Sequence, residues 1–367
     1  MESEQKGINS RRRYFMLDLV RIFCALAIFG RHAQTMGRFS FGRVFNVLFY
    51  NMTGNVMTCF FILSGFSIFI SNARYEFFRG GGNGCSALAF YKKRALNLLP
   101  VYYLAHIGWL FYAQCSISEY LMLTPIEVLG IQSIFNSLFG ILHNGGTWFI
   151  SCLLISYFVY PILQEIIKKL TYKGKLLILF IILFLVIYVP YVNMYFKCSD
   201  LYSNPIYRFM QFALGAILGA VSKQREAMKK NNPILSIGIV TVNFIVLMLA
   251  TYENIVKINN FAPILICVIL YFSIFINNHF LEKNVVLQYA SKLTYEFYIL
   301  QLFLWKPSSW VVNKLGLTTW KFKVMIPFVM LLLMSILVRE LYEKPIQNKI
   351  REYSSNVRTD RVRTSNL

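Results

Sequence analysis

The sequence predicts an all-α polytopic membrane protein with about ten transmembrane helices. Of its 367 residues, 57% are hydrophobic and only 14% are charged. Soluble globular chains contain about 45–50% apolar and about 25% charged residues. A water-soluble domain of the observed composition would expose large apolar patches and aggregate. Aromatic residues make up 17% of the chain, which suits lipid-facing helices with rings at the membrane interfaces.

Ten stretches of the chain are apolar enough to predict membrane spans, because a helix needs about 20 mainly apolar residues to cross the hydrocarbon core. They lie at residues 14–34, 46–72, 97–114, 147–167, 175–192, 206–222, 233–250, 259–278, 292–312 and 323–342. The third and sixth are short, and Lys306 and Pro307 interrupt the ninth. We therefore expect a cytoplasmic N-terminal segment at 1–13, a transmembrane domain at 14–345, and a cytoplasmic, disordered tail at 346–367.

The basic residues between the spans predict that both termini are cytoplasmic. Three inter-span loops and the C-terminal tail, all on one side of the membrane, carry most of these residues, whereas loop 115–146 on the opposite side has no Lys or Arg. Cytoplasmic loops are the ones enriched in Lys and Arg. The last outer loop, with Lys314, Lys321 and Lys323, departs from this pattern.

Charge and cysteine usage exclude two other classes of protein. The formal net charge of +21 comes from short clusters between apolar runs, so it indicates membrane orientation and not nucleic-acid binding. The seven cysteines are scattered singly, without a CxxC or CxxH pair. Neither a disulfide framework nor a metal site is therefore expected.

Three ionisable residues lie within the first predicted span: Asp18, Arg21 and His32. Such groups are costly inside a membrane and usually functional. At 100° per residue, Arg21 and His32 differ by only about 20° around the helix axis, and Asp18 and His32 by about 40°. The stripe must face protein or water. Two interpretations remain open: Asp18 and Arg21 form an interfacial ion pair while His32 lies among the headgroups, or the stripe lines a functional path.

Several motifs, in this order, make the chain resemble the acyltransferase-3 family of integral membrane O-acyltransferases. The resemblance covers about residues 13–347. The motifs are a basic residue followed eleven positions later by His in the first span, FFILSGFSIF, KKRALNLLPVYY, GTWFISCLLISYFVYP, YRFMQFALGAILGA, SKLTYEFYILQLF and LVRELYEKPIQNKI. Each motif is weak alone, but their order and spacing together are specific.

The resemblance implies an enzyme of a bacterial cytoplasmic membrane that moves an acyl group, most often acetyl, from cytosolic acyl-CoA to a hydroxyl of a surface glycan or its lipid-linked precursor. It implies no metal. His32 is the expected general base, with a covalent acyl-imidazole left open as an alternative. Arg21 would hold acyl-CoA or stabilise charge on its carbonyl oxygen, and Asp18 would orient Arg21. The other expected supporting residues are Ser64, Gly65, Trp148, Arg208 and Glu343. The residues expected to hold the nucleotide end of the donor are Lys92, Lys93 and Arg94.

The chain also departs from the family pattern. Asn97 stands where a second Arg is often found in the cytosolic motif. Leu153 and Leu154 replace a Glu-Glu pair of many relatives, which resembles the branch associated with polysaccharide and capsule modification. Gln211 and Gln301 replace a common Glu and a common His. Catalysis would therefore depend chiefly on His32.

Two other functions stay open on sequence grounds. A polytopic flippase or polymerase for lipid-linked glycans would share the basic inner loops and the aromatic content, but it would not depend on acyl-CoA. A non-catalytic membrane partner protein would keep the fold without the chemistry. The acceptor sugar, the donor acyl chain and the oligomeric state are not predicted.

Overall fold

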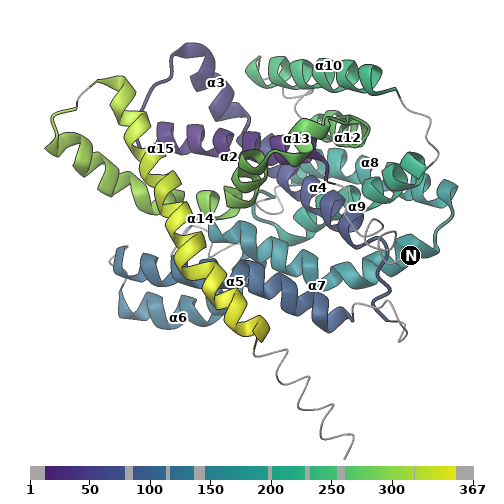
Figure 1. The fold of residues 1–367 in the computed structure, drawn as a ribbon, viewed down its shortest axis with the longest axis horizontal. Helices are drawn as coiled ribbons and strands as arrows, with labels where there is room; N and C mark the ends of the chain where they lie inside the picture. Colours follow the sequence, from purple (N-terminus) through teal and green to yellow (C-terminus); the bar gives the residue numbers. More distant parts are fainter. Residues whose placement is uncertain are drawn as a thin grey trace, which may run out of the picture.

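The computed structural model describes residues 13–78, 86–112, 116–135, 145–196, 201–227, 232–253, 261–317 and 319–352 (Figure 1). Within these ranges the chain is helical and contains no β-strand. The α-helices are α2 (Phe15–Thr35), α3 (Arg43–Asn51), α4 (Thr53–Asn72), α5 (Ala87–Tyr112), α6 (Ile117–Val128), α7 (Thr147–Lys169), α8 (Tyr172–Phe196), α9 (Pro205–Ala227), α10 (Pro233–Tyr252), α12 (Ala262–Ser273), α13 (His279–Lys283), α14 (Val285–Lys314) and α15 (Trp320–Leu337). A short 3-10 helix, η1 (Gln132–Ile134), and a π-helix, η3 (Val338–Glu343), complete the described elements.

Helices α4 and α9 cross at the centre of the bundle, where two glycines let their backbones touch. A Cβ added to Gly65 would lie 1.9 Å from the carbonyl oxygen of Phe212, and one added to Gly215 would lie 1.9 Å from that of Ile62. Both distances are far below van der Waals contact, so no side chain larger than hydrogen fits at either position. Small residues serve this purpose in membrane helix pairs, because they allow close backbone packing.

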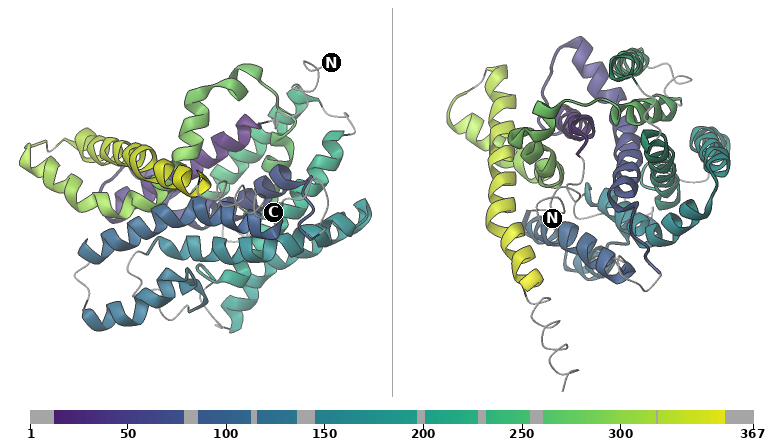
Figure 2. Two further views of the ribbon diagram at one scale, coloured as in Figure 1. Left: turned by 60° about the horizontal axis from the view of Figure 1, so that its bottom comes forward. Right: turned by 45° about the vertical axis from the view of Figure 1, so that its right-hand side comes forward.

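Helices α8 and α10 lie at the edge of the bundle (Figures 1 and 2). α8 buries only Val186 and Ile187, although it is among the most apolar helices of the chain. An apolar helix that is exposed along most of its length is suited to contact with lipid. The second half of α14 and the first half of α15 form a hairpin that projects from the rest of the bundle (Figures 1 and 2).

Five described helices are long and apolar enough to cross a membrane: Thr53–Asn72, Thr147–Lys169, Tyr172–Phe196, Pro233–Tyr252 and Lys321–Glu352. Four further helices, α2, α5, α9 and α14, have 21 to 30 residues but are less apolar than these five. The all-α class is thus confirmed. The number of ten spans and the cytoplasmic position of both termini stay predictions.

The helices depart from the predicted spans in several places, and α6 lies within loop 115–146, where no span was predicted. The span at 46–72 is divided at Met52 into α3 and α4, and α3 has no buried residue. α12 has 12 residues, shorter than the span predicted at 259–278, and residues 254–260 lie outside the described chain. The last helix continues to Glu352, into the predicted tail, because Gln347 hydrogen-bonds Glu343 and Leu96 there. The rest of that tail and residues 1–12 are outside the described ranges.

Candidate active site

Asp18 and Arg21 form an ion pair at the N-terminal end of α2. Asp18 is 3% exposed, and its carboxylate accepts hydrogen bonds from Arg13 Nε (2.6 Å), Arg21 Nη1 (3.1 Å) and Ser291 Oγ of α14 (2.6 Å). Arg21 also donates from Nη2 to Ser67 Oγ of α4, at 2.6 Å. The carboxylate therefore fixes the guanidinium between α4 and α14. The predicted Asp18–Arg21 ion pair is present, and the Arg21 side chain is still 32% exposed.

Arg21 lines a cavity of about 480 Å³ between α2, α4, α5, α7, α14 and the end of α15. The lining residues are Arg21, Phe60, Leu63, Ser64, Asn97, Leu98, Phe149, Leu153, Tyr157, Lys292, Thr294, Tyr295, Tyr298, Arg339, Glu343, Gln347 and Arg351. We call this space the Arg21 cavity. It lies at the end of α2 that the basic loops predict to be cytoplasmic.

The Arg21 cavity is cation-rich. Four of its lining side chains, Arg21, Lys292, Arg339 and Arg351, are basic, and Glu343 is the one carboxylate in the lining. Such a surface attracts anions, and guanidinium groups suit phosphate in particular because they can donate two parallel hydrogen bonds.

A buried charge network holds one wall of the cavity in place. Arg339 Nη1 contacts Glu296 Oε1 at 2.5 Å and Glu343 Oε2 at 3.3 Å. Glu296 is fully buried on α14, whereas Arg339 and Glu343 belong to η3. Single π-helical turns within α-helices occur frequently at functional sites. Here the turn carries two of the charged residues that line the cavity.

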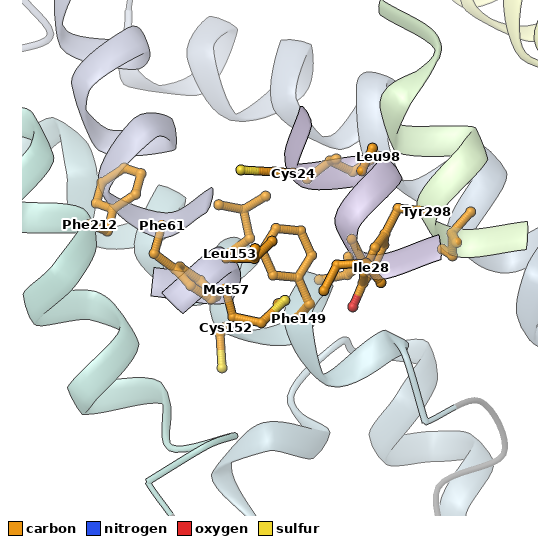
Figure 3. Packing of buried hydrophobic residues seen from close by; sticks show 14 of the residues in the cluster. Cys24, Ile28, Met57, Phe61, Leu98, Phe149, Cys152, Leu153, Phe212 and Tyr298 are labelled. Atoms are coloured by element: carbon orange, nitrogen blue, oxygen red, sulfur yellow. The ribbon is translucent and has the colours of Figure 1, made fainter. Parts of the chain in front are cut away.

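Aromatic rings form part of the wall of the Arg21 cavity. Phe149 lies 5.2 Å from Tyr298 and 5.7 Å from Phe60, measured between ring centroids, and all three rings line the cavity. Figure 3 shows Phe149 and Tyr298 beside Ile28, which lies on α2 between Arg21 and His32. These aromatic side chains therefore lie beside the middle of α2, between the levels of Arg21 and His32.

His32 lies in the last turn of α2 and contacts α14. Its Nδ1 is 2.7 Å from Oε1 of Gln301, which is 1% exposed. Gln301 follows Tyr298, which lines the cavity, by three residues on α14, which is about one helical turn. Arg21 and His32 are eleven residues apart on one helix, which corresponds to about 16 Å along its axis.

The remaining predicted residues fall into two places. Ser64 lines the Arg21 cavity, and its neighbour Gly65 makes the close contact with α9. Trp148 and Arg208 instead belong to a buried cluster outside the cavity lining: the Arg208 guanidinium lies 5.5 Å from the Trp148 ring and donates to the carbonyl oxygen of Tyr202. This cluster joins α7 and α9 to residues 201–204.

The structure does not bring the three predicted donor-binding residues into the cavity lining. Lys92 and Lys93 are exposed at the start of α5. Arg94 is half-buried and lies over the ring of Tyr157, with 5.4 Å between the guanidinium carbon and the ring centroid. Because Tyr157 lines the cavity, Arg94 is near it but behind an aromatic side chain.

Sequence reasoning missed several polar residues. Lys292 and Arg351 were not singled out, although both are cavity cations. His106 of α5 and Glu127 of α6 form a buried pair, with 2.9 Å between Nδ1 and Oε2. The rule applied to the first span, that an ionisable group inside an apolar stretch is significant, would have found His106. Within the described residues, no group of three or more His, Cys, Asp or Glu side chains could hold a metal ion.

Comparison with known families places this geometry in context. The sequence model of an acyltransferase domain matches residues 15–338, nearly the whole chain. The chain belongs to the acyltransferase-3 family. No curated protein and no solved structure matches it. Membership of the acyltransferase-3 family identifies a membrane acyltransferase, and the match includes the whole of α2, α4 and α14, which carry Arg21, Ser64, His32 and Gln301.

Proposed function

We propose that this acyltransferase is an O-acyltransferase that moves an acyl group, in the simplest case acetyl, from cytosolic acyl-CoA to a hydroxyl of a surface glycan or its lipid-linked precursor. The observation that carries the proposal is the division of α2 between two chemical environments. Arg21 lines a cation-rich cavity at one end, and His32 contacts the buried amide of Gln301 at the other.

The Arg21 cavity is the proposed donor site. Acyl-CoA carries phosphate groups at its nucleotide end and a long neutral arm that ends in the thioester. Arg21, Lys292 and Arg351 can pair with the phosphates, while the rings of Phe149 and Tyr298 suit the neutral arm. The separation of about 16 Å between Arg21 and His32 gives Arg21 a role in holding the donor and not in contacting the reacting carbonyl.

His32 is the proposed general base. The acceptor hydroxyl gives its proton to the imidazole as its oxygen attacks the thioester carbonyl carbon. The new carbon–oxygen bond forms, the carbon–sulfur bond breaks, and the imidazolium returns the proton to the leaving sulfur, which yields free CoA thiol. An imidazole is suited to this exchange because it gains and loses a proton near neutral pH.

The acceptor is proposed on the resemblance to relatives that lack the Glu-Glu pair, at whose position this chain has Leu153 and Leu154. A glycan flippase or polymerase is the main rival, and a non-catalytic partner protein is another. Neither needs an acyl-CoA site, so binding of acyl-CoA separates the proposed enzyme from both.

Binding of radiolabelled acetyl-CoA to the purified protein tests the donor site. The variant Lys292→Glu/Arg351→Glu should lose at least about tenfold in affinity, because two charge-assisted contacts of about 1.5–3 kcal/mol each are replaced by repulsion. The matched control Lys92→Glu/Lys93→Glu makes the same charge change at exposed positions outside the cavity and should bind nearly as the unmodified protein does. Absence of binding to the unmodified protein would contradict the proposal and favour a flippase.

A further inference from the structure

The contact between His32 and Gln301 is part of a continuous seam between two parallel helices. At one end of the seam, Arg13 donates to the carbonyl oxygen of Gln288, and Ser291 donates to Asp18. Residue numbers rise together along α2 and α14, so the helices run in the same direction. These contacts fix the register of α14 against α2 on the N-terminal side of His32.

Beyond Gln301, the seam continues with the contacts of Trp305 on α14. The rings of Phe29 and Trp305 stack with 5.4 Å between their centroids. Trp305 also packs against Gly37, where an added Cβ would come within 2.9 Å of the indole ring. Gln301 is thus clamped between polar contacts on one side and an indole on the other, so its approach to His32 is set by the packing of the whole helix pair.

Gln301 keeps this contact at a cost. Gln301 is only 1% exposed, and its Nε2 has no hydrogen-bond partner among the residues that the structure describes. An unsatisfied buried donor costs about 1–3 kcal/mol. The amide is therefore not placed to satisfy its own hydrogen bonds. What its position achieves is an oxygen 2.7 Å from Nδ1 of His32.

From this geometry we infer that Gln301 is a positioning residue, which accepts the Nδ1–H of His32 and so leaves the lone pair of Nε2 for the acceptor hydroxyl. The inference rests on the proposed function, since it assigns the tautomer of the proposed base. In a neutral imidazole one nitrogen carries the proton and the other accepts, and the hydrogen bond at one nitrogen decides which. Arg31, the charged neighbour of His32 on α2, stacks on the ring of Tyr50.

Three substitutions separate positioning from packing. Gln301→Leu keeps the approximate volume but removes the acceptor, and Gln301→Asn keeps an amide but withdraws it by one methylene. Both should lower kcat by about tenfold or more while KM for acetyl-CoA stays unchanged, because the donor cavity is untouched. Asn also serves if the leucine variant does not fold. The side chain of Gln301→Glu can only accept a hydrogen bond from Nδ1, so the kcat of this variant should be close to that of the unmodified protein.

The kcat of Gln301→Glu should be measured across roughly pH 6 to 9. A carboxylate beside His32 favours the imidazolium, so the pH range in which this variant is active moves toward higher pH. Full kcat in Gln301→Leu would overturn the inference. Loss of activity in Gln301→Glu at every pH would also overturn it, because it would show that an amide N–H is needed. Failure of the proposed function looks different, since the unmodified protein would then transfer no acyl group.

Discussion

Replacement of Gly65 by alanine tests the packing on which the cavity depends. The added Cβ would lie 1.9 Å from the carbonyl oxygen of Phe212 and 2.9 Å from the backbone nitrogen of Ala216. A carbon–oxygen contact needs about 3.3 Å, so α4 and α9 must move apart by about 1.4 Å. Both obstacles are backbone atoms and cannot rotate away. Overpacking of this kind costs about 1–3 kcal/mol in the free energy of unfolding.

Thermal unfolding in detergent measures this cost. A change of 1 kcal/mol shifts Tm by about 2–4 °C in domains of 150–250 residues, so Gly65→Ala should lower Tm by about 2–12 °C. Gly215→Ala, the reciprocal contact, should give a similar fall. Gly238→Ala is the matched control, because a Cβ there meets no atom within 4 Å and alanine favours the helix. Equal Tm values for Gly65→Ala and Gly238→Ala would refute the close crossing of α4 and α9.

Three further substitutions test the charged groups. Arg21→Gln should raise KM for acetyl-CoA by about 10-fold or more, through loss of a charge-assisted contact, and an unchanged KM in steady-state assays would remove Arg21 from the donor site. Arg339→Met leaves the fully buried Glu296 without its cation and should cost about 3–5 kcal/mol in the free energy of unfolding. The double variant Arg339→Met/Glu296→Gln should restore much of this loss. A Tm that does not recover in the double variant would count against the charge network. Glu127→Leu leaves His106 without its carboxylate and should lower Tm without changing KM for acetyl-CoA, because neither residue lines the Arg21 cavity; a rise in KM would argue against this separation.

The first helix shows what sequence reasoning can predict. Spacing alone placed Asp18, Arg21 and His32 on one stripe, and in the structure Asp18 and His32 both contact α14, while Arg21 reaches Ser67 of α4. Helical periodicity is a local property, so the side chains that share a face follow from residue numbers. The same reasoning located the long apolar helices, because apolar length is also read along a single stretch of chain, but it missed α6, which lies within the predicted loop 115–146.

The partners of those residues could not be predicted in the same way. Gln301 lies 269 positions from His32, and the cavity cations come from helices at both ends of the chain. Proximity of this kind depends on how the helices pack, which one sequence does not specify. The emphasis on Lys92 and Lys93 came from a visible basic run, whereas Lys292 is isolated in sequence and joins Arg21, Arg339 and Arg351 only in the fold.

The most direct test of the central claim is the acyl content of the host's surface glycans when the only copy of this protein is His32→Ala. Acylation should fall to the level seen without the protein, while the amount of protein, its membrane insertion and its binding of acetyl-CoA stay normal. Acylation that stays at the unmodified level in His32→Ala would show that another group removes the proton, and would contradict the assignment of His32 as the base.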